Sequence, residues 1–110
     1  MDAHAEIEPG VCGLQASVFA TSADDRTVTF KIETGCEKVA GFADALKNLG
    51  PVDAYQEINP AGTSVVLQTA RNVLKGCCAA CAVPVGLFKC MQVAAGLALP
   101  KDVQIHLSKN

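Results

Sequence analysis

The sequence has little charge. Of its 110 residues, 18% are Asp, Glu, Lys or Arg, and the net charge is −2. A nucleic-acid-binding protein neutralises phosphates with many Lys and Arg side chains, so we expect no nucleic-acid partner. Intrinsic disorder is disfavoured as well, because half of the residues are hydrophobic. We therefore expect one folded domain over residues 1–110.

The sequence also lacks the hydrophobic runs that direct a protein into or across a membrane. Residues 1–6 are acidic and precede no apolar run, so we expect no secretory signal. No stretch approaches the length of a membrane span, so we expect no membrane partner and a cytoplasmic location. In that reducing compartment, metal binding or thiol chemistry explains six cysteines better than disulfides do.

Motifs of common enzymes are missing too. The sequence contains no nucleophile elbow, no phosphate-binding glycine loop and no zinc-protease motif. Its two histidines are poor candidates for a site, because His4 falls in a terminus expected to fray and His106 is expected to point outward from a strand. We assign no catalytic residue and expect a binding protein rather than an enzyme.

Hydrophobic periodicity predicts the elements of the fold. Alternation over residues 14–21 and again over residues 28–32, around the turn-forming pair Asp24-Asp25, predicts a β-hairpin. Helical spacing follows over residues 36–49, 64–74 and 84–95, and residues 51–62 form a polar connection with at most a helical turn. Val103, Ile105 and Leu107 alternate as a final strand.

This order predicts an α+β fold. Its antiparallel sheet would consist of the N-terminal hairpin and the C-terminal strand, with about three helices on one face. Five cysteines fall at junctions between the predicted elements, and Cys90 falls inside the last helix, where we expect it to pack as a small hydrophobic side chain. The junctional cysteines are Cys12, Cys36, Cys77, Cys78 and Cys81.

Cysteines in loops can turn toward one point, as a metal site requires. Thiolates are soft ligands for zinc or iron, and a tetrahedral site needs four of them. Cys36 and Cys81 begin predicted helices, where unpaired amides and the helix dipole favour the thiolate. We expect Cys12, Cys36, Cys78 and Cys81 to bind an iron–sulfur cluster, with Cys77 as a further candidate ligand in place of Cys78.

Two alternatives stay open. The first is a thiol-disulfide or persulfide carrier that uses the CxxC motif of Cys78 and Cys81, although the βαβ pattern usual for redox CxxC motifs is missing. The second is a structural zinc module, in which the metal supplies folding free energy. The sequence leaves an oligomer open in each case.

The layout resembles the iron–sulfur cluster scaffold family of the IscU and NifU N-terminal type. The resemblance rests on Cys12-Gly13 before the hairpin, on Phe30 to Cys36 leading into a helix, and on Cys81 before a later helix, and it spans roughly residues 11–95. It implies an IscU/NifU-like fold, and donor or acceptor proteins that exchange the cluster. That family has an aspartate two places after its first cysteine, whereas this chain has Leu14, which favours a stably held cluster over a transferred one.

The resemblance has further departures. A His-Cys pair precedes the last helix of the scaffold family, and this chain has Cys77 and Cys78 instead. The proline-rich motif that a chaperone recognises is replaced by residues 73–76, so handoff through that chaperone is not expected. Residues 78–103 are also similar to a small uncharacterised family of cysteine-bearing proteins from anaerobes, which supports the grouping of the cysteines without naming a task.

Overall fold

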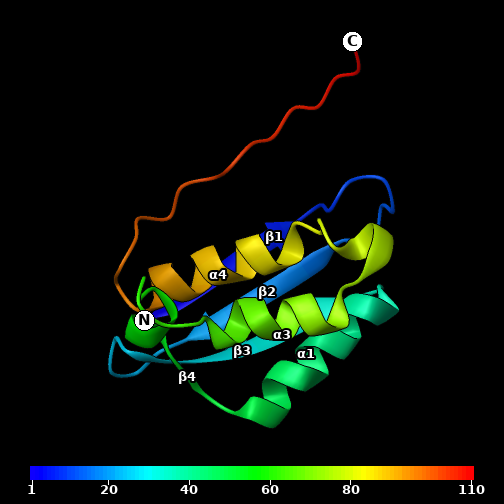
Figure 1. The fold of residues 1–110 in the computed structure, drawn as a ribbon. Helices are drawn as coiled ribbons and strands as arrows, with labels where there is room; N and C mark the ends of the chain where they lie inside the picture. The colour runs from blue at the N-terminus through cyan, green and yellow to red at the C-terminus, as the bar shows by residue number, and fades with distance from the viewer.

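The structure is a computed structural model that describes residues 1–110, and it shows an α+β fold built on a four-stranded antiparallel sheet (Figure 1). The strands lie side by side in the order of the sequence. They are β1 (Asp2–Ile7), β2 (Ala16–Thr21), β3 (Thr27–Thr34) and the two-residue β4 (Val52–Asp53). Strands β1 and β4 therefore form the two edges of the sheet.

Four α-helices and one 3₁₀ turn follow the first three strands. They are α1 (Glu37–Leu49), α2 (Ala54–Glu57), α3 (Val65–Val73), η1 (Gly76–Cys78) and α4 (Val83–Ala94). Helix α4 lies along β1 and β2, while α1 lies along β3 and also packs against α3 (Figure 1). The core forms between the sheet and these helices, where Val18 and Val28 from the strands join Phe42, Leu87 and other buried side chains.

The hairpin and the three long helices confirm the sequence prediction. Asp24 closes the hairpin turn, because its Oδ1 accepts hydrogen bonds from the backbone N–H of Arg26 at 3.0 Å and of Thr27 at 2.7 Å. Ser64 begins α3 by accepting a hydrogen bond from Leu67 N–H at 3.0 Å. The polar connection over residues 51–62 contains β4, which the sequence did not reveal, and the short helix α2.

The two ends of the chain correct the prediction. Residues 2–7 were expected to fray, but they form edge strand β1, with Ala3 and Ala5 toward the helices and His4 on the other face. The predicted C-terminal strand is wrong, because residues 95–110 form no strand and residues 98–110 are all exposed. Local alternation is equally compatible with both segments, but only β1 finds a neighbouring strand within the chain.

No stretch as long as a membrane span was expected, and this statement about length is wrong. Residues 76–94 are long and apolar enough, by length and composition alone, to cross a membrane. Helix α4 itself spans 12 residues, and Leu87, Cys90, Met91 and Ala94 among them are buried in the core. The core helix of a globular domain has the same composition, and the packing of α4 on the sheet accounts for its hydrophobicity.

Candidate functional site

The loop between β1 and β2 presents Cys12. Gly10 and Gly13 adopt φ angles of 105° and 68°, and Gly13 N–H donates to the Gly10 carbonyl at 2.9 Å. These glycines close a tight turn in a conformation that other residues rarely adopt. Cys12 lies in this turn and is exposed. The thiol is therefore open to solvent.

Cys36 stands at the start of α1. It is the N-cap residue, with an extended backbone (φ −88°, ψ 120°), and its side chain caps no amide of the helix. Its N–H donates to Thr34 Oγ1 at 3.1 Å, and the Thr34 hydroxyl donates to the Gln15 carbonyl at 3.0 Å. Thr34 therefore ties the start of α1 to the loop that carries Cys12. Sequence reasoning missed Thr34, because its alternation pattern shows only a strand position.

Leu14 also joins these two segments. A Cβ atom on Gly35 would lie 3.8 Å from Leu14 Cδ2, which is ordinary van der Waals contact. The Leu14 side chain thus lies beside the residue that precedes Cys36. A partly exposed apolar side chain therefore lies between the Cys12 loop and the residue that precedes α1.

Cys77, Cys78 and Cys81 follow one another through two short turns. Cys78 N–H donates to the Lys75 carbonyl at 3.2 Å, and Cys81 N–H donates to the Cys78 carbonyl at 3.1 Å. Cys77 is exposed, whereas Cys78 and Cys81 are partly buried against the core. The turns therefore direct two of the three thiols inward and leave Cys77 in solvent.

A close approach of α4 to β1 positions Cys81. A Cβ atom on Gly86 would lie only 2.4 Å from Ile7 Cδ1, so α4 reaches this distance because residue 86 has no side chain. Ile7 also packs against a small buried cluster of Ala16, Val39 and Val83, and Cys36 and Cys81 pack against the same cluster. One apolar surface thus supports the cysteines that begin α1 and α4.

Burial and three other cysteines change the pKa of Cys81. Burial raises the pKa of the Cys81 thiol, a hydrogen bond from Val83 N–H lowers it, and the negative charges of Cys12, Cys36 and Cys78 raise it further. These three sulfurs therefore lie close enough to Cys81 for their charges to be felt. The expected acidification of Cys81 by the start of α4 is wrong, because burial outweighs the single amide hydrogen bond.

The four cysteines converge without forming a finished site. No three His, Cys, Asp or Glu side chains are arranged to hold a metal ion. The expected set of Cys12, Cys36, Cys78 and Cys81 is thus gathered at one end of the sheet, and a common ligand would have to draw its members together. Cys90 is buried at 4% exposure, and burial raises its pKa, so its predicted place in the core is confirmed.

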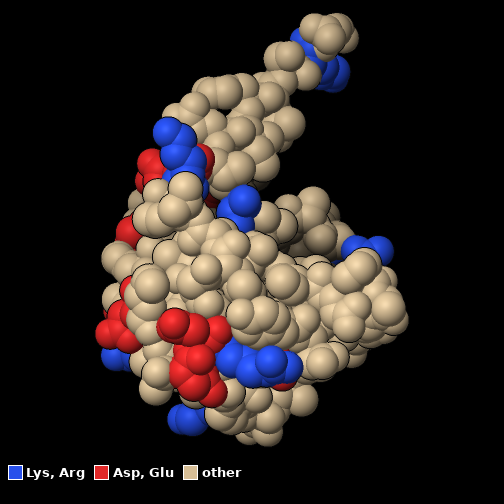
Figure 2. All heavy atoms as spheres, turned by 90° about the vertical axis from the view of Figure 1, so that its left-hand side faces the viewer, with Lys and Arg blue, Asp and Glu red and all other residues tan.

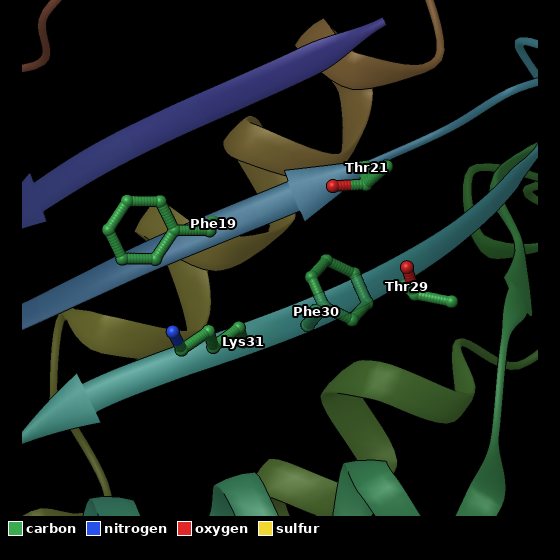
Figure 3. A pocket seen from close by; sticks show the side chains of 5 residues that line it. All are labelled: Phe19, Thr21, Thr29, Phe30 and Lys31. Carbon is green, nitrogen blue, oxygen red and sulfur yellow. The ribbon is translucent and has the colours of Figure 1, made fainter.

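Two shallow hollows lie elsewhere on the surface, and they contain few reactive or metal-binding side chains. A shallow hollow of about 330 Å³ opens on the helix-free face of β2 and β3, and its lining includes Phe19, Thr21 and Lys31 but no cysteine, carboxylate or histidine (Figure 3). His4 lies on the same face, stacked on Phe19 at 4.6 Å between ring centroids. A second hollow of about 250 Å³, lined mostly by hydrophobic side chains of α3 and α4, includes Cys81 and Arg71.

Comparison with known proteins identifies the family. The model of a family of unknown function, DUF6951, matches residues 3–107. The chain belongs to the DUF6951 family. No curated protein and no solved structure matches the chain. The family match covers β1 and most of the exposed C-terminal segment as well as the cysteine-bearing loops.

Proposed function

We propose that this DUF6951 protein binds an iron–sulfur cluster through Cys12, Cys36, Cys78 and Cys81. The observation that carries the proposal is that Cys36 and Cys81 pack against one apolar cluster, with Cys78 in the same turn as Cys81. Cys12 lies in the loop that Thr34 ties to the start of α1, and its charge is among those that raise the pKa of Cys81. Gathering thiolates without a cation is unfavourable, because like charges repel. A bound metal centre removes that cost, and iron or zinc is the metal that thiolates select.

The surroundings of the thiols fit a cluster. The small cluster of Ala16, Val39 and Val83 covers one side of Cys36 and Cys81 with apolar groups, and such a wall excludes water. The backbone N–H of Val83 lowers the pKa of Cys81, and an amide that interacts with a ligand sulfur in this way tunes the potential of a cluster. Cys12 lies in an exposed turn between two glycines, so it can close on a bound group.

The order of elements supports an IscU/NifU-like arrangement within this proposal. Cys12-Gly13 precedes the β2–β3 hairpin, Gly35-Cys36 leads into α1, and Cys81 comes just before α4. Leu14 against Gly35 favours retention of the cluster over release. The protein would then act in the cytoplasm as a carrier, store or sensor of clusters, with donor or acceptor proteins as partners and without catalysis of its own.

The test is the content of iron, zinc and acid-labile sulfide per chain, with an absorption spectrum, in protein purified without oxygen. We expect iron and sulfide together in the wild type, their loss in Cys36→Ala, and their retention in Cys90→Ala, which removes a thiol from the core. Unchanged iron in Cys36→Ala refutes the proposal. Cys77→Ala and Cys78→Ala, compared in the same way, decide which of these two neighbours is a ligand.

The two alternative functions give different results in this test. Zinc without sulfide, and unfolding of the protein by a chelator, would identify a structural zinc module. A metal-free folded protein would favour a thiol or persulfide carrier, in which Cys78 and Cys81 cycle through a disulfide independently of Cys12. The raised pKa of Cys81 weighs against this carrier, because the thiolate is the reactive form of cysteine.

A further inference from the structure

The C-terminal segment, residues 101–108, exposes an apolar stripe. Val103, Ile105 and Leu107 are 59%, 73% and 93% exposed, and they alternate with polar residues. Figures 1 and 2 show this segment leaving the body of the protein as an extended arm. The family match continues through residue 107, so the arm is part of the DUF6951 domain. Its stripe has no cover within its own chain.

Edge strand β1 has unpaired backbone groups to which an extended segment could hydrogen-bond. Ser22 N–H donates to the Met1 carbonyl at 3.1 Å, and the Met1 amino group donates back to the Ser22 carbonyl. Hydrogen-bonded pairs alternate along an antiparallel ladder, so Ala3, Ala5 and Ile7 also direct their backbone groups toward β2. The N–H and C=O groups of Asp2, His4 and Glu6 consequently point away from β2, along an unpaired edge.

The helix-covered face is incomplete along this edge. On β2, Ala16, Val18 and Ala20 are at most 1% exposed. On β1, the equivalent side chains of Ala3, Ala5 and Ile7 are only partly buried. An added strand would lay its apolar side chains beside them. Because directly opposed residues point to the same face of a sheet, Val103, Ile105 and Leu107 would cover these positions, while Gln104 and His106 would share the open face with His4 and Glu6.

Charge along the paired edges is mixed. The β1 strand and the residue after it carry Asp2, Glu6 and Glu8 and no Lys or Arg, whereas Lys101, Asp102 and Lys109 flank the apolar stripe. Figure 2 shows basic atoms at the base and at the tip of the arm, with acidic atoms beside those at the base. The apolar stripe and the unpaired edge of β1, rather than charge, therefore carry the pairing.

We infer that residues 101–108 form a fifth strand on β1 of a second copy of the chain, in a reciprocal exchange that makes a dimer. The geometry of α4 favours a second copy over the same chain. Helix α4 begins near Ile7 and runs back along β1, so the arm starts near the N-terminus, and its direct path along its own strand is parallel (Figure 1). A twofold axis supplies the stronger antiparallel pairing.

Two measurements on the full chain test whether two copies pair through their arms: the molar mass in solution and amide hydrogen exchange. Metal-free, reduced protein is used, so that neither a cluster nor a disulfide joins two copies. We expect light scattering to give twice the chain mass of 11.4 kDa for the wild type and for Gln104→Lys, and the single mass for Ile105→Lys. Both substitutions add the same charge to an exposed arm outside the core, and only the second lies on the apolar stripe.

Amide exchange identifies the strand that receives the arm. The N–H groups of Asp2, His4 and Glu6 should exchange slowly in the wild type and rapidly in Ile105→Lys. A single-chain mass for the wild type overturns the inference, whether these amides are protected, which indicates docking on the same chain, or unprotected. A dimer that survives Ile105→Lys also overturns it, because the copies would then meet elsewhere. Neither result depends on whether the protein binds a cluster.

Discussion

Replacing Glu57 should destabilise the protein more than replacing any other acidic residue. The Glu57 side chain is 6% exposed and joins the end of α2 to the start of α3. Its Oε1 accepts from the Ser64 hydroxyl at 2.9 Å and from Val66 N–H at 2.7 Å, and its Oε2 accepts from Val65 N–H at 2.7 Å. A carboxylate at a helix N-terminus also interacts favourably with the helix dipole.

The size of the destabilisation depends on which backbone N–H groups lose their hydrogen-bond acceptor. In Glu57→Ala, Val66 N–H remains buried without an acceptor, which costs about 1–3 kcal/mol. Water can reach Val65, which is 44% exposed, so the loss of that bond adds only about 1 kcal/mol. We expect a total near 3 kcal/mol for Glu57→Ala. In Glu57→Gln the amide oxygen keeps the hydrogen bonds from Val66 N–H and the Ser64 hydroxyl. Only the hydrogen bond from Val65 N–H and the negative charge are lost, which should lower the free energy of unfolding by about 1–2 kcal/mol.

Urea unfolding followed by far-ultraviolet circular dichroism measures this effect, since the chain has no tryptophan. The expected order of stability is wild type, then Glu57→Gln, then Glu57→Ala. Glu37→Gln is the matched control, because Glu37 is an exposed acidic residue in the first turn of α1. It should change the free energy of unfolding by less than about 0.5 kcal/mol. If Glu57→Ala and the wild type have the same free energy of unfolding in urea, the buried carboxylate does not hold α2 and α3 together.

Three further predictions concern the turn, the helix contact and the thiols. Gly86→Ala places a Cβ atom against Ile7 and should destabilise by about 1–3 kcal/mol, and Ile7→Ala in the same chain should recover part of this loss in urea unfolding; additive losses would contradict the contact. Hydrogen bonds from backbone amides lower the pKa of Asp24 from 3.8 to about 2, so its contribution to stability is present above pH 4 and is lost as the pH falls to 2. The difference in free energy of unfolding between the wild type and Asp24→Asn should therefore shrink from pH 4 to pH 2. A difference that stays constant over this range would contradict the lowered pKa of Asp24. Exposed Cys77 should be alkylated before Cys81, whose pKa is raised, as peptide mapping after brief iodoacetamide treatment would show; the reverse order would contradict the burial of Cys81.

The elements that the sequence predicted correctly are those governed by local rules. The hairpin depends on alternation and on Asp24 as a turn residue, and α3 depends on Ser64 as an N-cap and on its apolar stripe. Both signals lie within a few residues of the element itself. The junctional positions of Cys12, Cys36 and Cys81 follow from the same boundaries, so the sequence alone was sufficient to place these cysteines at the ends of elements.

Contacts between distant segments decided the rest. Residues 2–7 and 103–107 both alternate, but β1 reaches β2 through residues 8–15, and closing a short loop costs less entropy than closing a long one. The pKa of Cys81 depends on its burial against the core and on charges from its own loop and two others, and no local pattern contains the distant contributions. The sequence determined the helices, the hairpin and the places of the thiols along the chain. The packing of α4 on β1 and β2 determined which segment pairs with β2 and which thiols are buried, because burial depends on all elements at once.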